Sequence, residues 1–205
     1  MNVEELMTGG SVLPMTRWGE PVMHAQTTPV TVFDEDLAAL ARDMFATMNA
    51  SQGVGLAATQ VGRDMSMFIF CCPDEDDVVH AGVVCNPVVI LPEGNERNLE
   101  ESEEGCLSFP GAYEMLARPD KAVCRGQDVE GDLIEIEGTG LLARCLQHET
   151  DHLSGIVFGD RLNGKRRRSL HKKAEEMAYR YPADWPISEK LPFDPEQHRE
   201  SSSPA

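Results

Sequence analysis

Residues 140–155 read GLLARCLQHETDHLSG, and their spacing is typical of a helix with two unlike faces. At about 100° per residue, four side chains fall in one narrow stripe: Leu141, Cys145, His148 and His152. Two histidines one turn apart do not normally face a core without a partner, and a metal ion supplies one. Glu149 flanks the stripe, where it could reach a water molecule on the metal. The stretch predicts a metal-binding helix over about residues 140–153, ended by Gly155. The alternative is a pair of surface histidines at an exposed helix end.

The rest of the chain predicts an α+β fold, in which antiparallel or mixed β-sheets pack around this central helix. Another helix is expected over residues 34–49, with Asp34 as its N-cap. A third is expected from about Lys165 to before Pro182. Strands are expected over residues 65–71, 82–90, about 95–100, 120–126 and 132–138. We expect one folded domain over residues 1–181, followed by an extended or flexible tail. That tail, residues 182–205, holds five of the thirteen prolines.

Composition narrows the possible partners. The net charge of −17 disfavours broad binding to DNA or RNA, because phosphates would be repelled. The basic stretch GKRRRSLHKK, residues 164–173, is the exception. It is either a solvated helix face or a local docking patch. No apolar run is long enough for a membrane helix, and the acidic start resembles no signal peptide. The cytoplasm is the expected compartment, where the six cysteines would remain thiols.

A metal site on the central helix needs a third protein ligand, and the residues offer more than one. A zinc endopeptidase would use Glu175 or Glu176 downstream. The stretch EEGCLSFPG, residues 103–111, offers Cys106 upstream, which would leave one position open for water. A closed structural zinc site is a further possibility, with Cys145 as its fourth ligand.

A glycine-rich stretch, GVGLAATQVG at residues 53–62, matches neither common phosphate-binding loop. It is either a tight turn or a segment that a substrate backbone approaches closely at Gly53 and Gly55. Gln60 carries a neutral amide donor of the kind that stabilises an oxyanion.

Three motifs together, GVGLAATQ, EGCLS and HETDH, resemble those of the peptide deformylases in order and in approximate separation. The resemblance covers about residues 10–180, so it makes residues 1–181 the catalytic domain. It implies a metal-dependent hydrolase that removes the formyl group from the N-terminal formylmethionine of new polypeptides and releases formate. A metal-bound water would attack the formyl carbon, with Glu149 as general base and then acid.

The same resemblance assigns roles to particular residues. The metal ligands would be Cys106, His148 and His152. Gln60 and the backbone N–H of Leu107 would form the oxyanion hole. Gly55 would bind the substrate backbone, and Val54, Leu141 and Cys145 would form the methionine pocket. Glu104 and Arg118 would be a salt bridge that supports the metal loop.

The family resemblance also implies Fe²⁺ as the native ion, one per chain, with Zn²⁺, Ni²⁺ or Co²⁺ able to substitute. The partners would be formylmethionyl nascent chains, with a possible ribosome contact through residues 165–173. Two departures from the pattern concern peptide recognition. The segment GAYEMLA, residues 111–117, lacks an arginine found in many relatives, and Arg144 stands where an apolar residue is common.

Overall fold

The main sheet has five strands in the order β1-β2-β3-β6-β7, and every neighbouring pair is antiparallel. The computed structural model describes residues 2–194. The strands of this sheet are β1 (Gly55–Ala57), β2 (Met67–Pro73), β3 (Val79–Ile90), β6 (Lys121–Gln127) and β7 (Leu133–Thr139). The sequence of β2, MFIFCCP, is apolar at nearly every position because both faces of the strand are buried.

Alternate side chains of β2 enter two different cores, as the two-residue period of a strand requires. Met67 and Ile69 pack into a cluster with helix α2 (Glu35–Ser51). Phe68 and Phe70 pack into a second cluster with helix α3 (Gly140–Leu153). The sheet therefore lies between α2 and α3, and the predicted α+β architecture with a central helix is confirmed.

Helix α3 covers the expected residues 140–153, whereas α2 begins after its predicted N-cap and ends two residues later than the expected residue 49. The side chain of Asp34 accepts a hydrogen bond from Leu37 N–H at 3.1 Å, which caps the start of α2. Gly155 follows the end of α3 with φ +72°, a conformation that glycine adopts without strain. A side chain there would also meet the backbone of His24 at 2.8 Å. A further short helix, α1 (Val3–Leu6), was not predicted.

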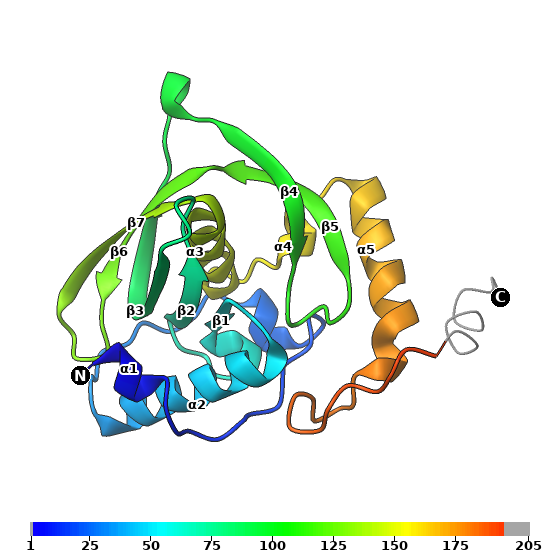
Figure 1. Ribbon diagram of the computed structural model, residues 1–205, viewed down its shortest axis with the longest axis horizontal. Helices are drawn as coiled ribbons and strands as arrows, with labels where there is room; N and C mark the ends of the chain where they lie inside the picture. Colours follow the sequence, from blue (N-terminus) through cyan, green and yellow to red (C-terminus); the bar gives the residue numbers. More distant parts are fainter. Residues whose placement is uncertain (1, 195–205) are drawn as a thin grey trace.

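A separate two-stranded hairpin consists of β4 (Leu99–Gly105) and β5 (Tyr113–Pro119). The sequence prediction of a strand at about residues 95–100 was wrong in position, and β5 was not predicted. Strand β4 reads LEESEEG and is mostly exposed, so it lacks the apolar alternation that identifies a strand. Figure 1 shows α3 between the main sheet and this hairpin, with α5 (Gly164–Met177) along the outer side of the hairpin.

The remaining elements are α4 (Phe158–Arg161) and the 3₁₀ helices η1 (Pro21–His24), η2 (Ala58–Val61), η3 (Gly94–Glu96) and η4 (Ala178–Arg180). No helix within residues 2–194 combines the length and apolarity that crossing a membrane requires.

Residues 182–194 form no helix or strand, yet they pack on the domain. Trp185 is 5% exposed and belongs to the core cluster of α2. Its carbonyl accepts a hydrogen bond from Met15 N–H at 2.8 Å, and the Arg17 guanidinium lies 5.6 Å from its ring centre. This part of the predicted tail is therefore an anchored strap. Residues 195–205 lie outside the described residues, and the domain boundary at residue 181 stays a prediction.

The strap yields a test of stability. Trp185→Ala is expected to lower the free energy of unfolding by about 3–5 kcal/mol, because it leaves a large cavity in the core. Ile187→Ala is the matched control, since Ile187 is 54% exposed two residues away. It should change stability by less than about 0.5 kcal/mol. Urea denaturation measures both variants, and equal small effects would show that the strap is not part of the core.

Candidate metal centre and active site

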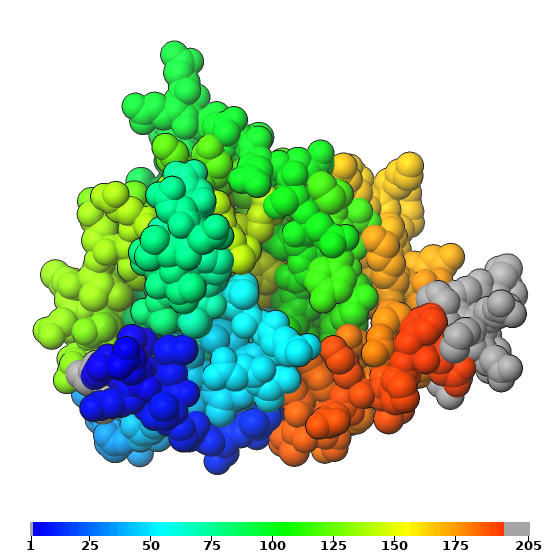
Figure 2. Space-filling view, in the orientation of Figure 1, coloured from blue at the N-terminus to red at the C-terminus, as the bar shows by residue number. Residues whose placement is uncertain are grey.

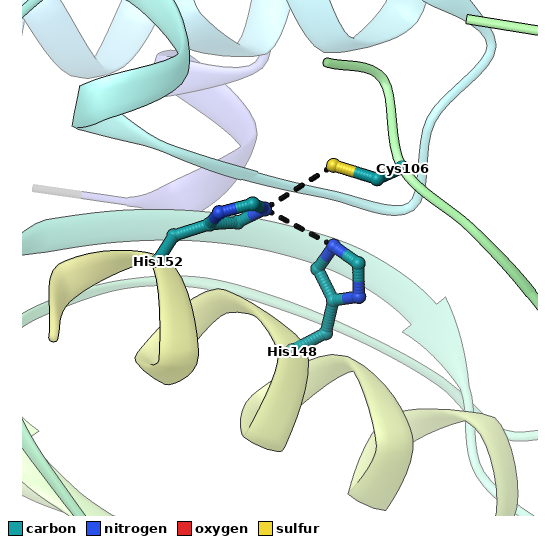
Figure 3. A group of neighbouring side chains, drawn as sticks. All are labelled: Cys106, His148 and His152. Carbon is teal, nitrogen blue, oxygen red and sulfur yellow. Dashed lines mark hydrogen bonds between the residues drawn. The ribbon is translucent and has the colours of Figure 1, made fainter. Parts of the chain in front are cut away.

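Three side chains, two on α3 and one in the loop after β4, converge on one point, and Figure 3 shows them facing one another. The ligand atoms of Cys106, His148 and His152 all lie within 4.8 Å of one another. His152 Nε2 is 3.1 Å from His148 Nε2 and 3.3 Å from Cys106 Sγ. The histidines share a face of α3 because they are four residues apart, and Cys106 follows β4 directly. One thiol and two imidazoles form a donor set that suits Zn²⁺ or Fe²⁺ with one position open.

The orientation of His148 is set by Glu104. His148 Nδ1 donates to Glu104 Oε1 at 2.7 Å, so the lone pair of Nε2 faces the other two ligand atoms. Burial alone would raise the pKa of Glu104. Hydrogen bonds from Arg118 and His148 nevertheless hold that pKa well below its usual range. The carboxyl is therefore ionised, and the predicted Glu104–Arg118 salt bridge is present at 2.8 Å.

Glu149 is buried beside these side chains, and its Oε2 has no hydrogen-bond partner within residues 2–194. A buried carboxylate oxygen without a protein partner is free to accept a hydrogen bond from a water molecule in the site. Burial raises the pKa of Glu149 to about 7. A carboxyl with that pKa can both accept and return a proton near neutral pH.

Gln60 presents its amide to the same point. Its Oε1 accepts from Ala57 N–H at 2.8 Å, which turns the NH₂ group inward. Nε2 then lies 3.5 Å from Cys106 Sγ and 3.4 Å from Ser108 Oγ. The glycine-rich stretch thus contains β1 and η2, rather than only a turn, and it fixes a buried amide donor next to Cys106.

A cleft of about 320 Å³ opens onto this group. Nine of the ten predicted site residues line it: Val54, Gly55, Gln60, Cys106, Leu107, Leu141, Cys145, His148 and Glu149. The tenth, His152, is fully buried behind it. A Cβ on Gly55 would stand 2.5 Å from Glu149 Oε1 and 2.7 Å from Cys145 Sγ, so only glycine fits there.

Sequence reasoning missed one wall of the cleft. Tyr181, Trp185 and Lys190 line it from the strap and the turn before it, opposite Tyr113 of the hairpin. Figure 2 shows the strap, in orange, beside the cyan segment near residue 50 and the green hairpin. Lys190 Nζ donates to Gln52 Oε1 at 3.4 Å across this junction. Tyr181 and Trp185 were the available signal, because paired aromatic residues are rare in a mobile tail.

The rival ligand sets do not form. Glu175 is exposed on α5, and Glu176 on the same helix pairs with Lys172 at 3.5 Å. Cys145 Sγ contacts the carbonyl of Val54 at 3.7 Å and is not part of the ligand group. Within residues 2–194, Cys106, His148 and His152 are the group of such side chains that could hold a metal ion.

Two helical histidines, a thiol, a buried glutamate and an inward amide at the end of a cleft define the class of metal-dependent hydrolases. The family model described as polypeptide deformylase matches residues 12–168. The chain belongs to the polypeptide deformylase family. It is thus a metal-dependent hydrolase that removes the formyl group from formylmethionyl polypeptides, as the three motifs predicted.

Individual relatives agree with this assignment. Peptide deformylase 1 of Streptomyces avermitilis is 46% identical over 173 residues, which cover 84% of this chain and 80% of the relative. Peptide deformylase 2 of Streptomyces coelicolor is 45% identical over 83% of this chain and 93% of its own length. The crystal structure of a peptide deformylase from Legionella pneumophila superposes with a TM-score of 0.73 at 36% identity. That superposition covers 82% of this chain and 96% of the other.

Gly55→Ala tests the close approach in the cleft. The added methyl group must displace Glu149 or Cys145, so kcat/KM for formyl-Met peptides should fall about 100-fold. Gly19→Ala is the control, because a Cβ at Gly19 meets no atom within 4 Å. Formate release measures both variants. Wild-type activity of Gly55→Ala would mean that the backbone there does not approach the reacting groups.

Proposed function

We propose that Cys106, His148 and His152 bind one Fe²⁺ ion per chain, and that Glu149, Gln60 and Leu107 carry the hydrolysis. The convergence of the three ligand atoms beside a buried glutamate is the observation that supports this most directly. A thiolate ligand admits iron as well as zinc, and Ni²⁺ or Co²⁺ can occupy such a site. The bound ion supplies Lewis acidity and lowers the pKa of a water molecule.

Glu149 moves the proton in this reaction. It accepts a proton from the attacking water as the oxygen bonds to the formyl carbon. It then returns that proton to the departing nitrogen while the carbon–nitrogen bond breaks, so that formate and a free amine leave. Its buried position and its pKa of about 7 suit both halves of this cycle.

Gln60 and Leu107 stabilise the oxygen of the formyl group. Negative charge develops on that oxygen during attack, and the Gln60 amide and the Leu107 N–H are the proposed donors. Loss of one such donor typically lowers the rate about 10²–10³-fold. Gln60 needs no rearrangement to act, because Ala57 N–H already fixes its amide.

The methionine side chain occupies the part of the cleft formed by Val54, Leu141 and Cys145, next to the backbone of Gly55. Leu141 is 40% exposed and Val54 39% exposed, so both offer apolar surface at the mouth. The formyl group is small and needs no pocket of its own. Formylmethionine arises in translation, so we place the enzyme in the cytoplasm with nascent chains as its substrates.

Two variants separate metal binding from proton transfer. Cys106→Ala is expected to lose the metal on gel filtration, because two imidazoles alone hold it weakly. Glu149→Ala should retain one metal per chain and lose about 10²–10⁴-fold in kcat. Protein purified without oxygen is assayed for metal content and for formate release from a formyl-Met tripeptide.

The unformylated tripeptide and the wild-type enzyme are the controls for that experiment. Full metal occupancy in Cys106→Ala would remove Cys106 from the ligands. Substantial turnover by Glu149→Ala would remove Glu149 as the base. Zinc rather than iron in the active wild-type protein would contradict the metal assignment alone.

The basic segment 165–173 supports a further proposal, a contact with ribosomal RNA. Four of its cations already bind groups of the domain: Arg166, Arg167, Lys172 and Lys173. The exposed side chains of Lys165 and Arg168 have no such partner within residues 2–194. These two are therefore the cations available to phosphates.

The double variant Lys165→Gln with Arg168→Gln should reduce co-sedimentation with ribosomes several-fold and weaken its dependence on salt. Arg63→Gln with Lys121→Gln removes two exposed cations elsewhere and is the control for net charge. Equal binding by the two double variants would contradict the contact. Formate release should be unchanged in both.

A further inference from the structure

Arg144 lies on α3 one turn before His148, and it is only 8% exposed. Its Nη1 donates to Glu104 Oε2 at 2.8 Å and to the carbonyl of Leu116 at 3.0 Å. Its Nη2 donates to the carbonyl of Glu100 at 2.9 Å. All three acceptors belong to the β4–β5 hairpin. The guanidinium is thus directed at the hairpin, although the side chain also lines the cleft.

Glu104 receives four hydrogen bonds, two on each carboxylate oxygen. Oε1 accepts from His148 Nδ1 at 2.7 Å and from Arg118 Nη2 at 2.8 Å. Oε2 accepts from Arg118 Nε and from Arg144 Nη1, both at 2.8 Å. The carboxylate that orients His148 is therefore held from two elements, by Arg118 on β5 and by Arg144 on α3.

Arg144 also acts on the second metal-binding element. Its bonds to Glu100 and Leu116 join one residue on each strand of the hairpin to α3. Cys106 follows the last residue of β4. The position of the hairpin relative to α3 therefore determines where the Cys106 sulfur lies relative to the histidines. One side chain thereby contacts the orienting partner of His148 and the strand that carries Cys106.

We propose that Arg144 is a positioning residue of the metal centre. It fixes the Glu104 carboxylate that orients His148, and it fixes the hairpin that presents Cys106. This inference rests on the proposed function of Cys106 and the two histidines as ligands. It replaces the earlier expectation that Arg144 concerns recognition of the peptide.

The chain supplies a matched control in Arg161. This residue donates to Asp151 at 3.1 Å through Nε and at 2.5 Å through Nη2, and Asp151 in turn pairs with Arg118 at 2.9 Å. Arg161 is therefore in the same ionic network, but its bonds reach neither Glu104 nor the hairpin. The Arg161 side chain is 47% exposed and that of Arg144 10%, so metal release is compared with the free energy of unfolding of each variant.

The test uses the full chain loaded with Co²⁺, in wild-type form and as Arg144→Met, Arg144→Lys and Arg161→Met. The readouts are the half-life of the metal against a chelator, the visible spectrum of the bound Co²⁺ and the free energy of unfolding. Loss of an interaction behind a ligand commonly costs 10–100-fold in metal affinity or activity. We therefore expect Arg144→Met to release Co²⁺ about 10–100-fold faster with a shifted spectrum, and Arg161→Met to change the rate less than about threefold.

Arg144→Lys keeps the charge but has a single nitrogen, so its release rate should lie between those of the wild type and Arg144→Met. If Arg144→Met does not fold, the metal release and the Co²⁺ spectrum of Arg144→Lys test the proposal instead. Wild-type metal release and spectrum at Arg144, or equal acceleration in Arg161→Met, would overturn the proposal. A raised KM for formyl-Met peptides with unchanged metal release would also overturn it, in favour of a peptide contact. Metal release and the Co²⁺ spectrum can be measured whether or not the wild-type enzyme releases formate. A wild-type enzyme that releases no formate would contradict the proposed function, not the role of Arg144.

Discussion

An ionised carboxylate inside a protein is unstable unless nearby donors replace the water it has lost. At Glu104 those donors are two guanidinium groups and one imidazole, and the last of these belongs to a proposed metal ligand. The interaction joins three elements that are distant in sequence, β4, β5 and α3. Removal of any one donor leaves charge that the remaining groups must balance, so the arrangement tolerates little displacement. The geometry of the site depends on this requirement.

The hairpin that carries Glu104 illustrates why such bonds are needed. Two strands alone are marginally stable, and β4 contributes almost no apolar surface. Leu116 of β5 packs into an apolar cluster with Phe158 and Leu170, and basic side chains from outside add further contacts to the hairpin. Arg166 pairs with Glu101 at 2.5 Å, and Lys173 reaches the Tyr113 carbonyl at 2.7 Å. Two of the six lysine and arginine side chains of α5, Arg166 and Lys173, thus hold an acidic hairpin in place.

The sequence predicts the relative positions of side chains that are a few residues apart on one helix. His148, Glu149 and His152 are predicted because a helix fixes the positions of residues three and four apart, whatever surrounds it. The strands β4 and β5 were not predicted correctly because β4 is mostly exposed and the hairpin is held by contacts with α3, α4 and α5 that are distant in sequence. A local sequence pattern does not show such partners. The contacts of the strap with the domain were not predicted, for a related reason. Its many prolines suggest an extended chain, whereas the burial of Trp185 depends on a core built from residues far upstream.

The positions of the proposed metal ligands have two different origins. The separation of His148 and His152 is fixed by the helix itself, so it varies little as long as α3 is folded. The place of Cys106 has no such local determinant, because it depends on how the hairpin sits against α3. A change in the side chains that bind the hairpin to α3 therefore moves the sulfur of Cys106 more than the imidazoles of His148 and His152. The three-residue motif does not determine the position of the cysteine relative to the helix. Differences in metal affinity among chains that share these residues should accordingly arise from the hairpin and its arginine partners.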